Sequence, residues 1–292
     1  MKTTHVPIQI DLSYMNAATV VLPTNTHKIQ IVLVGCGGTG SYLAENIARL
    51  IRVLKDAGLE ASATFIDPDL VEDGNVPRSR FCEAEIGLPK ALALAGRYNA
   101  AWNLDITAIV DPFDPAKFPT HYRSLLVVVG AVDNHAARIS IAKTLDRQAP
   151  GQAAMTWVID CGNAFQSGQV LVGSASTPKH LRGAFPAPTI CTALPSPYLQ
   201  EPQLLAPAPK PKVTRPASCM ELMIGGQQSL NVNQRVAAEA SDYLTRLVLT
   251  HDLKRFASYF NLSTGNSHSL YVTPEAVAAA SRFPERSLLA AA

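Results

Sequence analysis

Short apolar runs alternate with longer amphipathic segments along the first 175 residues of the chain. Continuous apolar runs are typical of strands buried on both faces, whereas apolar residues recurring every three or four positions indicate helices packed on a sheet. The pattern predicts strands at residues 29–34, 61–66, 105–110, 124–130, 156–159 and 168–173, and helices at residues 39–55, 88–101 and 134–147. This alternation predicts an α/β fold with a doubly wound, mainly parallel sheet.

The sequence changes character after residue 175. Residues 178–216 are rich in proline and include PAPKPK. Because proline can neither donate to a sheet nor continue a helix, we expect an extended, mobile loop there. Beyond it, recurring apolar positions predict a long helix at residues 227–249, packed on the sheet or at a dimer contact. Strands are expected within residues 253–273, followed by a final helix or loose tail.

Glycines cluster directly after the first predicted strand, in GCGGTG at residues 35–40. Gly35, Gly37 and Gly40 form a GxGxxG spacing, with Gly38 between them. Glycine lets the backbone turn sharply and approach a pyrophosphate, while the next helix aims its first NH groups at the anion. The spacing alone also occurs in ordinary turns. Its place between a strand and an amphipathic segment predicts a nucleotide or phosphate site.

Asp67 follows the second predicted strand, where a carboxylate can accept hydrogen bonds from ribose hydroxyls. Such a residue suits either NAD or ATP. The neighbouring Pro68 and Asp69 also fit a simple turn or cap, with Asp69 as a solvated residue of the loop.

The segment after Asp67 supplies a group of polar and cationic side chains, namely Asn75, Arg78, Arg80 and Lys90. An enzyme that attacks the α-phosphate of ATP must neutralise a triphosphate and a departing pyrophosphate, which requires converging cations. A dehydrogenase has little use for them. Each residue alone fits a solvated basic loop, but the set favours ATP over NAD.

Asp133 and Asn134 follow the strand predicted at residues 124–130, at the edge where open α/β folds build their sites. Asp133 could bind Mg²⁺, which would bridge ATP phosphates, and it could equally cap the following helix. Arg138, one turn further, either orients Asp133 or is a surface arginine.

Four motifs follow one another in order: GCGGTG, FIDPDLVEDGNVPRSRF, IGLPKA and GAVDNHAAR. Together they resemble the family of ubiquitin-like-protein activating enzymes that includes ThiF and MoeB. The resemblance implies a Rossmann-like adenylation fold and a homodimer. It also implies an enzyme that uses ATP and Mg²⁺ to adenylate the C-terminal glycine carboxylate of a small ubiquitin-like protein, releasing pyrophosphate.

The resemblance assigns roles by position. It places Gly37 and its glycine turn against the phosphates, Asp67 on the ribose, Asn75, Arg78 and Lys90 on the triphosphate, and Asp133 on the metal. Arg78, Lys90 and Asp133 are then the expected catalytic residues, with Arg80 and Asn134 as further nucleotide contacts. Because a carboxylate nucleophile is already ionised near neutral pH, catalysis would rest on alignment and charge stabilisation.

The chain departs from this family in two ways. Relatives commonly have Arg-Gln where this chain has Arg78-Ser79-Arg80, and MoeB-like relatives bring an arginine from the N-terminal region of a dimer partner into the site. Residues 1–27 contain no arginine. Either Arg80 compensates, or the contribution of the partner is absent, or adenylation is slow.

The five cysteines form the second departure, because they include no CxxC pair of the kind that closes a structural zinc site in relatives. We therefore expect no structural zinc. Cys219, and after it Cys191, are candidates for a thioester carrier, although a free cysteine is more often a small buried hydrophobe. Cys161 fits packing at a strand end.

The composition limits the remaining function classes. The 292 residues are 47% hydrophobic with a net charge of +2, which suits one large domain and argues against nucleic-acid binding through a basic field. Neither a signal sequence nor an apolar run long enough to span a membrane is evident, so a cytoplasmic protein is expected.

The expected organisation is an N-terminal extension at 1–28, a nucleotide-binding adenylation core at 29–175, a proline-rich crossover loop at 176–225, and a helix with strands at 226–292 that completes the same domain. SCMELMIGGQQSLNVNQRVAAEA and a late YFNL resemble the ThiF-like proteins of PRTRC plasmid-associated systems, whose neighbours include a ubiquitin-like protein. The alternatives are a weakly catalytic nucleotide-binding scaffold and a relative acting on modified tRNA or a small molecule.

Overall fold

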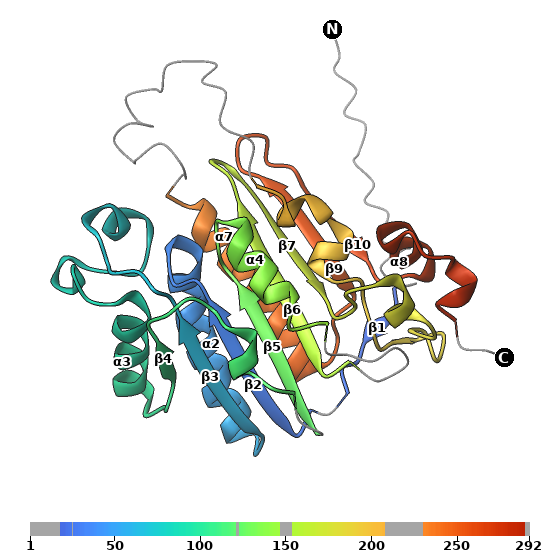
Figure 1. Cartoon of the computed structure of the whole chain (residues 1–292), viewed down its shortest axis with the longest axis horizontal. Helices are drawn as coiled ribbons and strands as arrows, with labels where there is room; N and C mark the ends of the chain where they lie inside the picture. Colours follow the sequence, from blue (N-terminus) through green and yellow to red (C-terminus); the bar gives the residue numbers. More distant parts are fainter. Residues whose placement is uncertain (1–17, 25, 121–122, 147–153, 208–229, 290–292) are drawn as a thin grey trace, which may run out of the picture.

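One mixed sheet of eight strands runs through the computed structural model, which describes residues 18–24, 26–120, 123–146, 154–207 and 230–289. Its strand order is β10-β9-β7-β6-β5-β2-β3-β4 (Figure 1). The strands are β2 (Lys28–Val34), β3 (Glu60–Ile66), β4 (Thr107–Ile109), β5 (Ser124–Gly130), β6 (Thr156–Asn163), β7 (Ser167–Gly173), β9 (Arg255–Asn261) and β10 (Ser267–Tyr271). A separate short pair joins β1 (Val20–Val21) to β8 (Ile190–Cys191).

The first half of the sheet, from β2 to β6, is parallel. β2 lies at its centre and pairs with β3 on one side and β5 on the other along its whole length. Its side chains alternate between the two faces, so Ile31 and Leu33 join one apolar cluster while Val32 and Val34 join the other. The chain reverses its winding direction between β2 and β5, which is where doubly wound folds bind ligands. The predicted α/β fold is confirmed.

The second half of the sheet is antiparallel. β7 runs back against β6, and β9 and β10 continue outward from β7. Residues beyond 230 therefore extend the sheet that begins at β2, rather than forming a sheet of their own.

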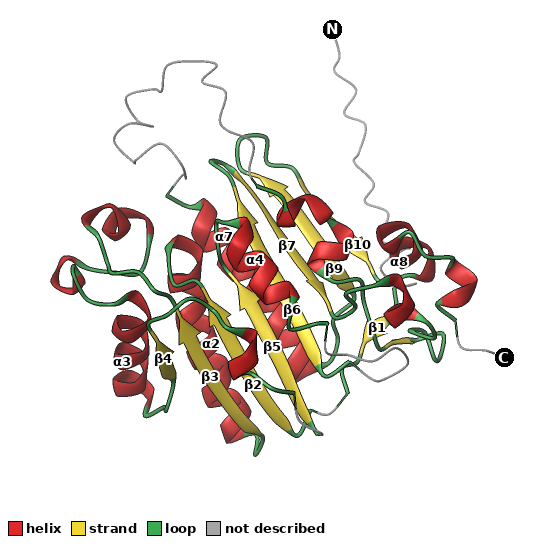
Figure 2. Ribbon diagram, in the orientation of Figure 1, coloured by secondary structure: helices red, strands yellow, loops and turns green. Residues whose placement is uncertain are grey.

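Helices cover both faces of the sheet (Figure 2). α2 (Gly38–Asp56), α3 (Lys90–Trp102) and α7 (Val232–Thr245) pack on one face, and α4 (His135–Ala142) and α5 (Pro197–Gln200) on the other. α8 (Pro274–Ser281) lies near the C-terminal end. The short helical turns are η1 (Asp73–Arg78), η2 (Glu83–Glu85), η3 (Pro115–Lys117), η4 (Pro178–Leu181), η5 (Pro202–Leu205), the π-helical η6 (Arg246–Thr250) and η7 (Glu285–Ser287).

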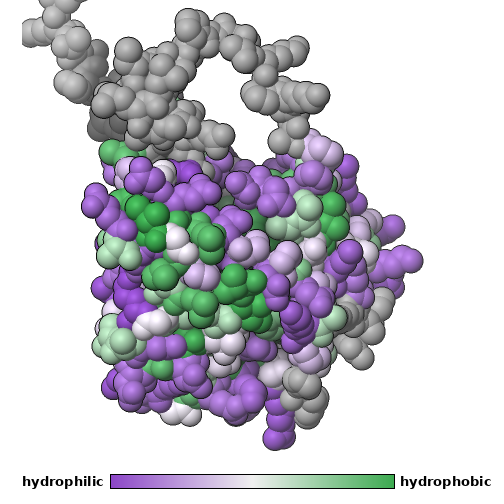
Figure 3. All heavy atoms as spheres, turned by 60° about the vertical axis from the view of Figure 1, so that its left-hand side comes forward, coloured by the Kyte–Doolittle hydropathy of each residue, from purple (hydrophilic) through white to green (hydrophobic). Residues whose placement is uncertain are grey.

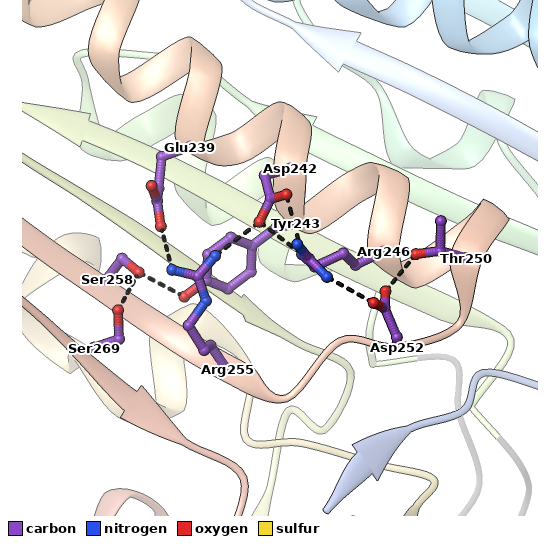
Figure 4. A network of polar contacts seen from close by, with 9 residues as sticks. All are labelled: Glu239, Asp242, Tyr243, Arg246, Thr250, Asp252, Arg255, Ser258 and Ser269. Carbon is purple, nitrogen blue, oxygen red and sulfur yellow. Dashed lines mark hydrogen bonds and ion pairs between the residues drawn. The ribbon is translucent and has the colours of Figure 1, made fainter. Parts of the chain in front are cut away.

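A polar network fixes the far end of α7 to β9 (Figure 4). Arg255 donates to Glu239 at 3.1 Å and to Asp242 at 2.7 Å. The buried hydroxyl of Tyr243 lies 2.8 Å from that of Ser258. Burial raises the pKa of Tyr243, so the phenol stays neutral and hydrogen-bonded. These contacts hold α7 in one position against the sheet.

Three predicted elements were wrong in extent. The proline-rich segment is folded over its described part, residues 178–207, where it forms η4, β8, α5 and η5. Pro178, Pro197 and Pro202 each start a helical turn, where the missing NH costs nothing. α4 ends at Ala142 rather than near residue 147. The long helix begins at Val232 and packs on α2, β6 and β7, and residues 208–229 lie outside the described part.

Gly40→Ala is expected to lower the free energy of unfolding by about 3 kcal/mol, because the added Cβ would lie 1.9 Å from the carbonyl oxygen of Gly35. Urea denaturation measures this loss. Gly96→Ala is the matched control, since Gly96 lies exposed in α3 with nothing within 4 Å of its Cβ position. That change should stabilise the protein by up to ~1 kcal/mol. Equal effects of the two substitutions would contradict the described turn.

Candidate active site

A cavity of about 980 Å³ opens at the carboxyl edge of the parallel strands. Its wall combines the turn after β2, the segments after β3 and β5, the end of β6, and parts of β7 and β9. This volume lies at the upper end of the range for small-molecule and cofactor sites. The cavity therefore has room for a nucleotide and part of a second substrate.

The glycine turn forms one wall. Gly35 has a φ of +89°, a left-handed conformation that favours glycine, and donates to the carbonyl of Ile66. Gly37 is the N-cap of α2, and the first NH groups of that helix have no acceptor within it. Gly35, Gly37 and Gly38 line the cavity, whereas Gly40 packs on Gly35. The wall thus presents helix NH groups suited to an anion.

Asp67 lies at the base of this wall, where it is nearly inaccessible to solvent. Its carboxylate accepts from the NH groups of Cys36, at 2.6 Å, and Asp69, at 2.9 Å. Burial raises the pKa of Asp67, and these NH groups together with the ammonium of Lys90 oppose the rise. Asp67 therefore also holds the glycine turn, a structural task beyond the ribose contact expected from the sequence.

Asn75, Arg78 and Lys90 line the cavity together. Asn75 is buried and accepts from the NH of Glu72, and Arg78 donates from Nε to the carbonyl of Gly74 at 3.2 Å. Lys90 is the first residue of α3, and its Nζ lies 3.0 Å from a carboxylate oxygen of Asp69. Asp69 is exposed, as expected for a solvated residue of the loop, and it also lines the cavity and orients Lys90.

Arg80 lies apart from this group. Its guanidinium pairs with Glu45 on α2 and stacks over the ring of Tyr42. Among the described residues that line the cavity, Arg80 is absent. The interpretation that Arg80 replaces a missing family contact is not supported by this position, because a carboxylate and an aromatic ring already hold the guanidinium.

Asp133 and Asn134 lie at the mouth of the cavity, and both are exposed. Asn134, not Asp133, caps α4: its Oδ1 accepts from the NH of Ala137 at 2.8 Å. The capping alternative for Asp133 is therefore wrong. An exposed carboxylate beside a cavity of this kind fits a Mg²⁺ ion shared with phosphate oxygens.

Arg138 neither orients Asp133 nor lies free on the surface, the two alternatives that the sequence left open. Its Nε donates to Asp160 at 3.1 Å, and the hydroxyl of Tyr198 donates to the same oxygen at 3.3 Å. Asp160 is fully buried, so its pKa is raised by desolvation against the opposing charge of Arg138. The sequence signal that could have indicated this buried pair is Asp160 itself, a single acidic residue inside the apolar run TWVIDC. This network ties α4 and α5 to β6.

The cysteines of the described residues are mainly packed. Cys36, Cys161 and Cys191 are buried and Cys82 is exposed. Burial raises the pKa of Cys191 to about 12, which disfavours the reactive thiolate and favours the packing interpretation. Cys161 lies within β6 rather than at its end, and it lines the cavity. Cys219 lies outside the described residues.

An apolar patch lies beside the cavity on the outer side of the segment between β3 and α3. It consists of the exposed side chains Leu70, Ile86, Leu88 and Leu92. The NH of Val71 donates to the carbonyl of Leu88, which brings the two parts of the segment together. Figure 3 turns the left-hand side of Figure 1 forward and shows several groups of apolar side chains among polar ones on that face. Exposed apolar patches commonly mark surfaces that protein partners cover.

The fold and the position of the cavity place this chain among the doubly wound α/β proteins that bind ligands at the carboxyl edge of the sheet. The ThiF family profile matches residues 24–268, more than half of the sequence. The chain therefore belongs to the ThiF family. No curated protein sequence matches it.

Solved structures share this fold. The chain is similar to E. coli MccB crystallised with AMPCPP and MccA, with a TM-score of 0.53 and 14% identity over 86% of this chain and 66% of MccB. MccB with ATP gives a TM-score of 0.52 at 14% identity, over 85% and 65% of the two chains. PaaA gives 0.51 at 15% identity, also over 85% and 65%. The chain thus spans slightly less than two thirds of the length of these proteins.

Within the described residues, no three His, Cys, Asp or Glu side chains converge as a metal site formed by protein ligands alone would require. No helix in that part of the chain has the length and apolar character needed to cross a membrane.

Proposed function

We propose that this protein uses ATP and Mg²⁺ to adenylate the C-terminal carboxylate of a small ubiquitin-like protein or peptide, releasing pyrophosphate. The observation that carries the proposal is the cavity itself. All four motifs that resemble the adenylating family contribute to its wall, although they are spread from Gly35 to Arg138 in the sequence. Their convergence is what an ATP site of this family would require.

Each group of residues in the cavity wall has its own proposed role. The helix NH groups after Gly37 would bind phosphate oxygens, and Asp67 would accept from the ribose. Arg78 and Lys90 would neutralise the charge that develops on the departing pyrophosphate, with Asn75 as a neutral donor. Asp133 would hold Mg²⁺, which supplies charge stabilisation at the phosphates when bound.

The acceptor would enter the side of the cavity that is formed by β7 and β9. Gly168, Gln169 and Tyr259 line this side and bring no carboxylate of their own. An acceptor carboxylate could therefore approach the α-phosphate without repulsion from these side chains. The MccB structures, which contain MccA with and without AMPCPP, support a peptide acceptor by similarity of fold.

A ubiquitin-like partner from a PRTRC-type neighbourhood, a homodimer and a cytoplasmic location belong to the same proposal. The resemblance of residues 218–240 supports the first. The apolar patch Leu70, Ile86, Leu88 and Leu92 is a surface that a second subunit or the acceptor could cover.

A weakly catalytic nucleotide-binding scaffold is the second candidate. One observation favours it: Arg80, the arginine available to compensate for the trans arginine of MoeB-like relatives, is bound to Glu45. The scaffold would bind ATP in the same cavity and turn it over slowly.

Calorimetry with ATP and NAD tests the nucleotide part of the proposal. ATP is expected to bind in the presence of Mg²⁺, and an excess of NAD should not displace it, because the cations of the wall match a triphosphate. Removing Mg²⁺ with a chelator should weaken ATP binding. Preferential binding of NAD would contradict the proposed site.

A further inference from the structure

Asn233, in the first turn of α7, lies fully buried behind the wall of the cavity. Its Oδ1 accepts from the hydroxyl of Thr39, at 3.0 Å, and from Nδ2 of Asn163. Asn163 also donates to the Thr39 hydroxyl, at 3.0 Å. Three side chains from α2, β6 and α7 therefore meet in one hydrogen-bonded group, and two of them, Thr39 and Asn163, line the cavity.

The other end of the same amide reaches the basic segment. Nδ2 of Asn233 donates to the backbone carbonyl of Arg78 at 3.2 Å. Gly38 leaves room for this amide, since a Cβ at position 38 would lie 2.4 Å from Nδ2. One buried side chain thus contacts the glycine turn, the end of β6 and the backbone of a cationic residue.

We propose that Asn233 is a positioning residue that holds the glycine turn and Arg78 in place for the nucleotide. This inference rests on the proposed ATP site and adds a residue to it. Asn233 is not itself among the cavity-lining residues, so it would act through Thr39, Asn163 and Arg78. An amide suits the task because it accepts through oxygen and donates through nitrogen, whereas alanine does neither.

The position of α7 brings Asn233 to the back of the cavity wall. The helix begins at the carboxyl edge of the sheet, beside the start of α2 (Figure 1), and packs along α2. Its first turn completes the wall from behind, although it lies 155 residues after Arg78 in the sequence. The geometry of the nucleotide site would therefore depend on the side chain of Asn233 in this first turn.

Four variants of the full chain test the inference: Asn233→Ala, Gly38→Ala, the double variant, and Tyr243→Phe. The last removes a buried hydrogen bond on the same helix, at the end away from the cavity, and is the control for loss of stability alone. The measurements are hydrogen–deuterium exchange without nucleotide, ATP affinity, and the KM and kcat of ATP–pyrophosphate exchange.

Asn233→Ala is expected to speed deuterium uptake at residues 36–42 and 74–80, and to raise the Kd and KM for ATP about tenfold, with a smaller fall in kcat. Gly38→Ala should give the same defect, because its Cβ displaces the amide. The double variant should then be no worse than either single variant, since both remove one interaction. Tyr243→Phe should leave the ATP affinity and kinetics at the parent values.

Unchanged ATP affinity in Asn233→Ala, or full additivity with Gly38→Ala, would overturn the inference. So would an equal loss of affinity in Tyr243→Phe, since the effect would then be one of stability. If the parent protein binds no ATP, the proposed function fails separately. Deuterium uptake still decides in that case whether Asn233 holds the wall, and unchanged uptake at both segments would reject it.

Discussion

Replacing Arg78 by alanine is expected to lower ATP–pyrophosphate exchange by about 100-fold or more. Arg78 lines the cavity together with Asn75 and Lys90, where the triphosphate is proposed to bind. Its removal takes away a charge-assisted donor at the point where negative charge grows as pyrophosphate departs. The fold should persist, since Arg78 is partly exposed and lies at the end of a short helical turn.

Arg80→Ala is the matched control for this prediction. The two arginines are separated by one residue, yet Arg80 pairs with Glu45 outside the cavity. Its replacement should change the exchange rate less than about threefold, because the guanidinium lies outside the cavity and Glu45 keeps a second ion pair, with Arg49. A large loss in both variants would contradict the placement of Arg80, and no loss in Arg78→Ala would remove Arg78 from the proposed mechanism.

Asp133→Ala should lower exchange by about 100-fold as well, but by a different route. The loss should fall mainly on the Mg²⁺-dependent rate, while ATP binding in the absence of the metal changes little. Raising the Mg²⁺ concentration should recover part of the activity if the carboxylate is a metal ligand, since phosphate oxygens still bind the ion. Titration of the exchange rate with Mg²⁺ measures this.

Asp146→Ala provides the control. Asp146 is exposed, lies shortly after α4, and does not line the cavity. Its variant should retain the Mg²⁺ dependence of the parent protein. If Asp133→Ala keeps the same Mg²⁺ dependence as the parent, Asp133 is not the metal ligand.

The sequence predicted the parts of the structure that depend on local patterns. Mainly apolar runs identified β2 and β5, because a strand covered by helices on both faces has few polar positions. The glycine spacing identified the start of α2, since the turn before this helix has a left-handed backbone at Gly35, which favours glycine. Residues at the carboxyl ends of parallel strands then converged on one cavity, as the topology requires.

Contacts between distant segments could not be predicted in this way. Nothing in the local pattern shows that Glu45 binds Arg80, or that Asn233 reaches the backbone of Arg78. The prediction of a loop in the proline-rich segment was wrong because proline excludes long regular elements but suits the first position of short helical turns. The packing of such turns on distant residues, as by Tyr198, cannot be read from the local sequence.

The most direct test of the proposed function is ATP–pyrophosphate exchange with Mg²⁺, measured with and without a ubiquitin-like protein encoded in the same genetic neighbourhood. We predict exchange that requires this acceptor and disappears when its C-terminal glycine is removed, because the acceptor carboxylate is the nucleophile. ATP binding without acceptor-dependent exchange would contradict adenylation of this acceptor and favour the scaffold.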